Sequence, residues 1–402
     1  MDFKVLIIGS DANAYYMARA CFEAYHKKAH LIAKEKLAFT KYSNILTIEY
    51  HQNLWDEEYF IKIINEYASK NKEQILIIST NETYSLFLAR NHSKLRKNLI
   101  CFEQDEKIIK SLINKEVFYK TYKNSCLPFP ETYYIDVVKD TLIPTMKYPV
   151  ILKPANVVLY NHLDFAGKKK IYKIVSEEEL KETLYTIKES GYNDRMILQE
   201  FIPGNDSYLF DSVVYVDTKG KVKVISFAQI GIQERKKSMI GNAAALINGL
   251  NTFDGDVEKA KKNIIEFMEQ LGMNGFFEID MKYDARDKKF KVLEINARQG
   301  RSSYYLVPLG ANLVQIMVDD LLYHKDLPFR DLKEKILLSF IPKNVLKKFT
   351  SNETFKKEAI KLWRKRVSPM ECPLDKNVKR FLMMKKRLWH YKKEYQNSDW
   401  EE

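Results

Sequence analysis

The stretch Gly275–Ser303 limits the fold of this chain more than any other segment. Apolar and polar residues alternate over 277–283 and again over 293–298, and the charged segment Asp284–Lys289 separates the two runs. A period of two is typical of strands that bury one face and leave the other polar. We therefore expect a β-hairpin whose polar face carries carboxylate, amide and guanidinium side chains.

Two carboxylates oppose each other on this hairpin. If the strands close over a five-residue loop, Asp280 lies opposite Glu294, and Asn296 and Arg298 follow on the same face. Like charges directly opposite destabilise a sheet, so a positive group is expected between them. Mg²⁺ takes carboxylate, amide and phosphate oxygens, so the pattern predicts one or two Mg²⁺ ions on Asp280, Glu294 and Asn296, with Arg298 near the transferring charge. The alternative is a solvated hairpin with surface carboxylates.

The first hundred residues alternate between strand and helix patterns. Lys4–Gly9 predicts a buried strand, Ser10–Asn13 is a polar turn that leads into a helix, and Ile75–Ser79 begins the same pattern again. Such units build an α/β layer, and a helix N-terminus can hold an anion. Helix capping is the alternative role of Asp11 and Asn13. Because only one of the three glycines of a dinucleotide-binding turn is present, we exclude an NAD site.

Composition excludes several other classes. The four cysteines are far apart and form no C-x-x-C pair, which argues against a disulfide framework or a zinc site and favours a reducing cytoplasm. The N-terminal apolar run is too short for a signal peptide, and no run of about 18 apolar residues is present. Residues 331–402 hold 19 basic and 10 acidic residues, so most of the net charge of +13 lies there. Such a tail predicts an anionic partner, either a membrane surface or nucleic acid.

Several motifs together resemble the ATP-grasp carboxylate–amine ligases. They are the E-x-N-x-R strand 294–298, Asp280 one strand earlier, and the lysines in Asn114-Lys115 and Ile151–Pro154. The resemblance covers roughly residues 1–330. Three stretches are similar, more narrowly, to the D-aspartate ligases of peptidoglycan synthesis: Gly9–Arg19, Phe201–Ser207 and Asn296–Ser303. Those enzymes use ATP to join the β-carboxyl of D-aspartate to the lysine side chain of the cell-wall peptide precursor.

The resemblance implies an α/β fold: an ATP-grasp fold preceded by a Rossmann-like N-terminal domain and followed by a basic α-helical C-terminal extension. The expected boundaries are 1–113 for the Rossmann-like domain, 114–330 for a two-lobed ATP-grasp domain with its hinge near 199–206, and 331–402 for the extension. Residues 377–393 mix large apolar side chains with a basic face. Such a helix either lies at an anionic membrane surface or docks on the body of the enzyme.

The resemblance also implies a nucleotide site. Lys115 would contact the α-phosphate, with a solvated helix surface as its alternative. Lys153 ends a buried strand and would bind phosphate, because an inward-pointing ammonium requires an anion. A structural ion pair is the alternative for Glu200, because a carboxylate in an apolar strand must be paired or solvated. At the hinge, the adenine and ribose would be bound by Glu200, Phe201, Ile202 and Asp206.

Contacts to the phosphates and the amino acid are less regular. The usual Gly-rich phosphate flap is missing, because Ala155–Asn161 has no glycine, and Lys168–Lys170 either clamps phosphate or forms a solvated turn. Arg301 would grip the carboxylate of an amino-acid substrate with two parallel N–H groups, beside Ser302. Arg235, in the basic loop 233–238, would receive that carboxylate or a pyrophosphate.

These assignments predict ATP-dependent amide formation: the γ-phosphoryl group passes to a carboxylate, and an amine attacks the acyl phosphate. Lys153 and Arg298 would stabilise the transferring charge. The expected cofactors are ATP and Mg²⁺, with Mn²⁺ as a substitute. The expected partners are D-aspartate and a peptidoglycan precursor rather than nucleic acid, in the cytoplasm or at the inner face of the membrane. The alternatives are an ATP-grasp amino-acid or peptide ligase with a different acceptor, or a membrane- or nucleic-acid-binding protein with a vestigial ATP site.

Overall fold

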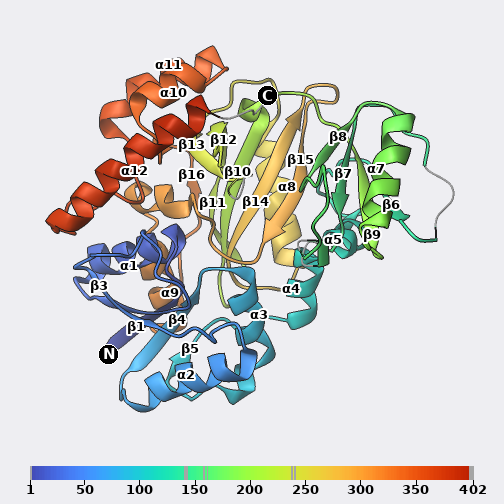
Figure 1. Cartoon of the computed structure of the whole chain (residues 1–402). Coiled ribbons are helices and arrows are strands. Elements are labelled where there is room, and N and C mark those ends of the chain that lie inside the picture. The colour runs from blue at the N-terminus through green and yellow to red at the C-terminus, as the bar shows by residue number, and fades with distance from the viewer. Residues whose placement is uncertain are drawn as a thin grey trace.

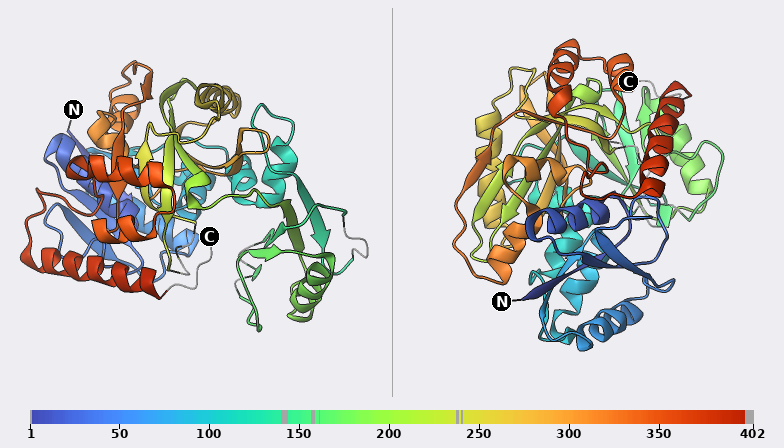
Figure 2. Two further views of the ribbon diagram at one scale, coloured as in Figure 1. Left: turned by 90° about the horizontal axis from the view of Figure 1, so that it is seen from above. Right: turned by 90° about the vertical axis from the view of Figure 1, so that its left-hand side faces the viewer.

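The computed structural model describes residues 2–397 apart from 140–143, 157–158, 161, 237–238 and 240. Within these ranges three β-sheets follow one another along the chain, as Figure 1 shows. The first sheet belongs to the N-terminal part, the second forms a small lobe, and the third is the large central sheet. The views in Figure 2 show the small lobe projecting from the rest of the molecule.

The N-terminal sheet is parallel, with strand order β3-β2-β1-β4-β5. Its interior strands are almost wholly apolar, because helices cover them. Asp11 caps the first helix by accepting a hydrogen bond from the Ala14 N–H (2.9 Å), whereas Asn13 donates to the backbone of Thr80 and Gln299. The elements are β1 (Phe3–Ile8), α1 (Ala12–Tyr25), β2 (Ala29–Ala33), β3 (Leu46–Tyr50), α2 (Glu57–Ser69), β4 (Gln74–Ser79), α3 (Glu82–Arg90) and β5 (Leu99–Ile100).

Two short helices lead into the small lobe, whose antiparallel sheet has the order β6-β9-β7-β8. Asn114 caps the second of them, so Lys115 is the first residue of that helix. The elements are α4 (Glu106–Ile113), α5 (Lys115–Tyr122), β6 (Thr132–Asp136), β7 (Val150–Pro154), β8 (Tyr172–Ile174), α7 (Glu177–Glu189) and β9 (Arg195–Glu200).

The large sheet has eight strands, in the order β15-β14-β10-β12-β13-β17, with β11 pairing β10 and β16 pairing β11. Its buried face packs on α8 and on aromatic side chains. The elements are β10 (Leu209–Val216), β11 (Val222–Ser226), β12 (Ala228–Gln233), β13 (Ala243–Asn248), α8 (Val257–Gln270), β14 (Gly275–Asp284), β15 (Lys289–Asn296), β16 (Arg330–Leu332) and β17 (Ile336–Ser339).

The hairpin β14–β15 confirms the expected pairing of Asp280 with Glu294. The loop is one residue shorter than expected, because Asp284 pairs with Lys289. An irregularity between Asp280 and Met281 restores the register. A bulge of this kind adds one residue to one strand and so keeps both carboxylates on the same face.

Helix α9 (Leu313–Leu321) precedes the expected C-terminal extension. The extension is largely helical, as expected, with α10 (Lys343–Phe349), α11 (Glu353–Leu362) and α12 (Val378–Gln396). It is not a purely helical extension, because β17 pairs with β13 inside the large sheet. Helix α12 docks on both the N-terminal part and the large sheet: Arg380 donates to the Phe39 carbonyl, and the Tyr395 hydroxyl donates to the Gln233 carbonyl. No helix in the described part of the chain is long and apolar enough to cross a bilayer.

Candidate active site

The candidate site lies on the polar face of β10, β14 and β15, next to the small lobe. The strand register places Asp211, Asp280 and Glu294 side by side across the three strands. Asn296 Nδ2 lies 3.3 Å from Asp280 Oδ2 and 3.5 Å from Glu294 Oε1. The three side chains predicted to bind metal therefore converge on one point.

Charge is unevenly balanced around this point. Lys115 forms an ion pair with Glu294, and its positive charge holds the pKa of that carboxyl down, at about 2. Burial, together with the negative charges of Glu278 and Glu294, raises the pKa of Asp280 well above its ordinary value. The expected positive group is thus partly supplied by Lys115, while the neighbouring carboxylates keep the surroundings of Asp280 negative.

The donor set fits Mg²⁺. It offers two carboxylates and one amide, all hard oxygen ligands, and the surplus of negative charge favours a cation. The amide NH₂ of Asn296 faces the carboxylates, so a half-turn of the amide is needed to present its oxygen. In the described residues no group of three or more His, Cys, Asp and Glu side chains is arranged for a metal.

A second ammonium lies beside Lys115. Lys153, at the end of β7, donates to Gln199 Oε1 (2.9 Å) and lies 3.5 Å from the Tyr119 hydroxyl. Burial and the positive charge of Lys115 lower the pKa of Lys153 to about 7. Two ammonium groups close together favour an anion between them, as phosphate binding requires. Neither Gln199 nor Tyr119 was singled out from the sequence, since only their approach to Lys153 marks them.

Arg298 joins the site to the N-terminal part. Its guanidinium pairs with Glu82 Oε1 (2.6 Å) at the start of α3 and with Glu278 Oε2 (3.4 Å) on β14. Ser302 donates to Glu278 Oε1 (3.2 Å) and to Asp211 Oδ2 (2.5 Å). Glu278 and Asp211 were not predicted as site residues, although the two-residue period places Glu278 on the same face as Asp280.

The hinge residues are engaged with protein partners. Both carboxylate oxygens of Glu200 are paired, with Lys291 at 2.6 Å and Arg286 at 2.7 Å. This is the structural ion pair that was the alternative for Glu200. Asp206 is 4% exposed and accepts hydrogen bonds from the Gln233 backbone and side chain. Ile202 is buried, and Lys173 and Lys282 lie over the ring of Phe201.

Arg301 and Arg235 are each engaged with a buried carboxylate outside the predicted metal set. Arg301 pairs with Glu234 Oε1 (2.6 Å) and lies over the Phe340 ring, 3.9 Å from its centre. Arg235 pairs with Asp206 Oδ2 (3.0 Å). Each arginine thus has a buried carboxylate partner within the protein, and their contacts to substrate stay predictions.

Parts of two predicted loops lie outside the described residues: 157, 158 and 161 of the flap, and 237 and 238 of the basic loop. In the basic turn Lys168–Lys170 that follows the flap segment, Lys170 contributes to the low pKa of Glu294, so its charge acts on the site. Lys168 instead donates to the Leu163 carbonyl.

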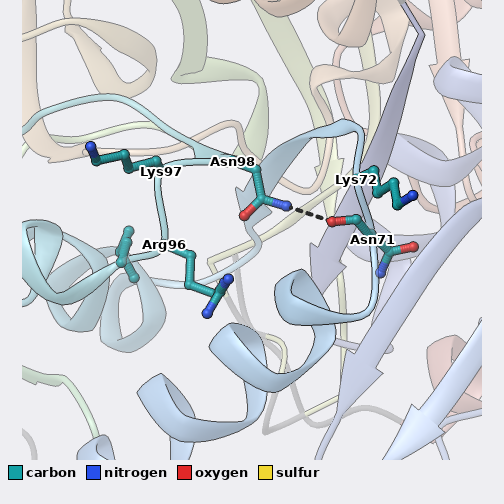
Figure 3. A pocket seen from close by; sticks show the side chains of 6 residues that line it. Asn71, Lys72, Arg96, Lys97 and Asn98 are labelled. Carbon is teal, nitrogen blue, oxygen red and sulfur yellow. Dashed lines mark hydrogen bonds between the residues drawn. The ribbon is translucent and has the colours of Figure 1, made fainter.

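A hollow of about 460 Å³ lies elsewhere, at the amino ends of β4 and β5 (Figure 3). Asn98 there donates to the Asn71 carbonyl, while Lys72, Arg96 and Lys97 point in different directions. The carboxyl end of β4 faces the candidate site instead, since the Ser79 carbonyl accepts from Gln299. This hollow therefore takes no part in the candidate site.

Comparison with known proteins agrees with this geometry. Residues 112–302 match the family described as ATP-grasp domain. The chain is 30% identical to a D-aspartate ligase of Enterococcus faecium, over 97% of its own length and 95% of that protein. It is 26% identical to a D-alanine–D-alanine ligase of a Wolbachia of Drosophila simulans, over 55% of this chain and 68% of that protein.

Solved structures show the same fold. An L-amino acid ligase from Bacillus licheniformis aligns with a TM-score of 0.59 at 16% identity, covering 79% of this chain and 74% of that one. An N5-carboxyaminoimidazole synthetase from Staphylococcus aureus, solved with ADP, aligns with a TM-score of 0.60 at 16% identity, covering 84% and 82%. The expected ATP-grasp fold is thus confirmed, and the chain belongs to the ATP-grasp carboxylate–amine ligases, which are ATP-dependent.

Proposed function

We propose that this ligase activates the β-carboxyl of D-aspartate and joins it to the lysine side-chain amine of a peptidoglycan precursor. The observation that carries this proposal is the similarity to a D-aspartate ligase, which spans 97% of the chain and includes the C-terminal part beyond the ATP-grasp domain. The reaction would release ADP and phosphate, because the γ-phosphoryl group leaves ATP for the carboxylate and is then displaced by the amine.

The contacts at the hairpin support the phosphoryl-transfer role. Asp280, Glu294 and Asn296 would hold one or two Mg²⁺ ions, or Mn²⁺, which cancel phosphate charge when bound. Lys115 and Lys153 lie where they would bind phosphate oxygens, and a neutral Lys153 would gain its proton as the anion arrives. Arg298, held by Glu82 and Glu278, would stabilise charge on the transferring group.

The nucleotide base would lie at the hinge near 199–206. The paired side chain of Glu200 leaves the backbone of Phe201 and Ile202 for the adenine edge, and Asp206 would face the ribose by exchanging part of its bond to Arg235. The proposed position of the base assumes that the hinge lies within a two-lobed ATP-grasp domain over 114–330, between a Rossmann-like domain over 1–113 and a C-terminal extension over 331–402.

Arg301, Ser302 and Arg235 are the proposed contacts of the amino acid. Ser302 already forms hydrogen bonds with the carboxylates of Asp211 and Glu278. This position favours Ser302 as a contact of the ammonium group of the amino acid. Arg301 would release its partner Glu234 and bind the substrate carboxylate that does not become activated. The bidentate geometry of a guanidinium suits a planar carboxylate.

We place the enzyme in the cytoplasm, with contact to the inner face of the membrane as part of the proposal. The outward face of α12 exposes Val378, Phe381, Leu382 and Trp389, and lysines flank them. Apolar and basic side chains on one helix face suit an anionic lipid surface. Co-sedimentation with anionic vesicles at low salt tests the membrane contact of α12. If the protein does not sediment with such vesicles, this contact is refuted.

Product formation tests the proposed reaction. ADP release is measured with Mg²⁺ and each enantiomer of aspartate, alanine and glutamate, with and without a lysine-containing cell-wall precursor nucleotide. The expected result is release that requires D-aspartate and the precursor together, with a product heavier by one aspartyl residue. If neither enantiomer of aspartate supports release with the precursor, the D-aspartate assignment fails and the broader ligase activity remains.

A further inference from the structure

A hollow of about 260 Å³ lies between α12 and the segment that follows β12. Its lining includes Lys236, Lys386, Arg387, His390, Tyr391 and Glu394. Figure 1 shows α12 running past the ends of β12 and β13, and the bond from the Tyr395 hydroxyl to the Gln233 carbonyl (2.5 Å) confirms this contact. The hollow is thus formed by two segments that are about 150 residues apart in the sequence.

The lining is positively charged. Lys236 and Lys386 are exposed at its rim, and neither has an ion pair among the residues that the structure describes. Arg387 is held in place, because its guanidinium lies 4.1 Å from the centre of the Phe39 ring and donates to the Tyr391 hydroxyl (3.3 Å). Glu394 is the acid that faces these three cations, so an excess of positive charge remains.

A short chain of contacts joins this hollow to the catalytic strand. The Tyr391 hydroxyl forms one wall, is buried, and donates to Glu234 Oε1 at 3.0 Å. Arg301, which follows the strand that carries Glu294, donates to the same hydroxyl at 3.4 Å and pairs with Glu234. The hollow therefore lies on the flank of the active site and not on a remote face.

We propose that this hollow binds an anionic group, phosphate or carboxylate, of the amine acceptor. The inference rests on the proposed function, since it assumes that the acceptor carries such a group in addition to its amine. Two unpaired lysines and an oriented guanidinium form a complementary site for a group of that size and charge. The helix that supplies most of the lining lies outside the matched ATP-grasp domain, residues 112–302, as expected for a contact with a partner that differs between ligases.

Charge reversal tests the proposal. The double variant Lys236→Glu/Lys386→Glu is compared with Lys385→Glu/Lys392→Glu, which makes the same change in net charge on the exposed side of α12. The KM values for the acceptor, ATP and D-aspartate are measured by ADP release, with a lysine-containing precursor nucleotide as acceptor. We expect the acceptor KM to rise roughly tenfold or more in the first variant only, with the other two KM values unchanged. Added salt should raise the acceptor KM of the wild-type enzyme more than that of this variant.

Two further acceptors identify the anion. If phosphate is the group bound, a nucleotide-free peptide shows no difference between the wild-type enzyme and the first variant. If a peptide carboxylate is bound, the difference persists with that peptide and disappears when its C-terminus is amidated.

Equilibrium dialysis of the precursor nucleotide without ATP separates this inference from the proposed reaction. If the wild-type enzyme is inactive but binds the precursor nucleotide through Lys236 and Lys386, the proposed reaction is refuted and the anion site stands. If the enzyme is active but Lys236→Glu/Lys386→Glu changes neither the acceptor KM nor the binding of the precursor nucleotide, the anion site is refuted and the proposed reaction stands. A wild-type enzyme that neither binds the precursor nor turns over with it overturns both.

Discussion

Substitution of Glu294 by Gln separates the two roles that the geometry gives this carboxylate. The amide keeps the shape of the side chain but removes the charge that pairs with Lys115 and contributes to the metal set. Lys115 and Glu294 side chains are 24% and 36% exposed, so solvent screens their ion pair. The pair should therefore contribute only about 1 kcal/mol to stability. Urea unfolding should show a small shift.

Turnover should fall much further. A preorganised charge at a phosphoryl-transfer centre typically contributes about 3–4 kcal/mol to the transition state, which corresponds to roughly 10²- to 10³-fold in kcat. A lost metal ligand should also raise the Mg²⁺ concentration needed for half-maximal rate. ADP release over a Mg²⁺ series measures both quantities. Asp287→Asn, on the loop of the same hairpin, is the matched control and should leave both near the wild-type values.

Lys115→Met removes the ion pair but retains the carboxylate, and so distinguishes metal binding from positioning of the lysine. If the double variant Lys115→Met/Glu294→Gln behaves like Lys115→Met alone, with the same Mg²⁺ requirement, Glu294 acts only by holding Lys115. A Glu294→Gln enzyme that turns over within about twofold of wild type would refute the metal role and with it our interpretation of the hairpin.

Other substitutions test neighbouring parts of the structure. Arg301→Lys should raise the KM for D-aspartate roughly ten- to hundredfold with ATP binding nearly intact, because one bidentate contact is lost; a collapse of ATP affinity instead would assign Arg301 to the nucleotide. Gly300→Ala should destabilise the fold by about 1–3 kcal/mol in urea unfolding, since a Cβ there would lie 1.6 Å from Glu278 Oε1. Lys291→Met should cost about 3 kcal/mol at pH 7, because it leaves half-buried Glu200 and buried Asp284 without this cation, whereas exposed Lys289→Met should cost little.

The Lys291→Met penalty should also depend on pH. Burial raises the pKa of Asp284 and Glu200, but hydrogen bonds from Arg286 and Lys291 outweigh it and hold both below their ordinary values. A lowered folded-state pKa stabilises the protein above the unfolded value of about 4, and this stabilisation is lost as pH falls through the folded-state pKa. The wild type should therefore lose its advantage over the variant as pH falls below about 4, and an advantage unchanged at pH 3 would contradict the pairing.

Local pattern was sufficient to predict the hairpin and the pairing of its carboxylates. Alternation over 277–283 and 293–298 required two strands with one polar face, and it placed Asp280 opposite Glu294 even though the loop length was wrong. The shorter loop would by itself shift the pairing of the two strands by one residue and turn the buried side chains outward. A bulge restores the register at a lower cost in free energy. Lys153 was also recognisable, because an ammonium at the end of an apolar strand requires an anion, whereas Lys115 was marked only by the resemblance to the ATP-grasp ligases.

Only the tertiary structure decided which charges meet across long separations. Arg298 pairs with Glu82 from the N-terminal sheet, Arg301 with Glu234, and Tyr391 of α12 bonds to that same Glu234. These partners are 67 to 216 residues apart along the chain. A single sequence contains no periodic signal for such pairs, because the packing of sheets and helices brings them together. The same packing decided between the two alternatives for the basic helix, because α12 docks on the body of the enzyme through Tyr391 and Tyr395.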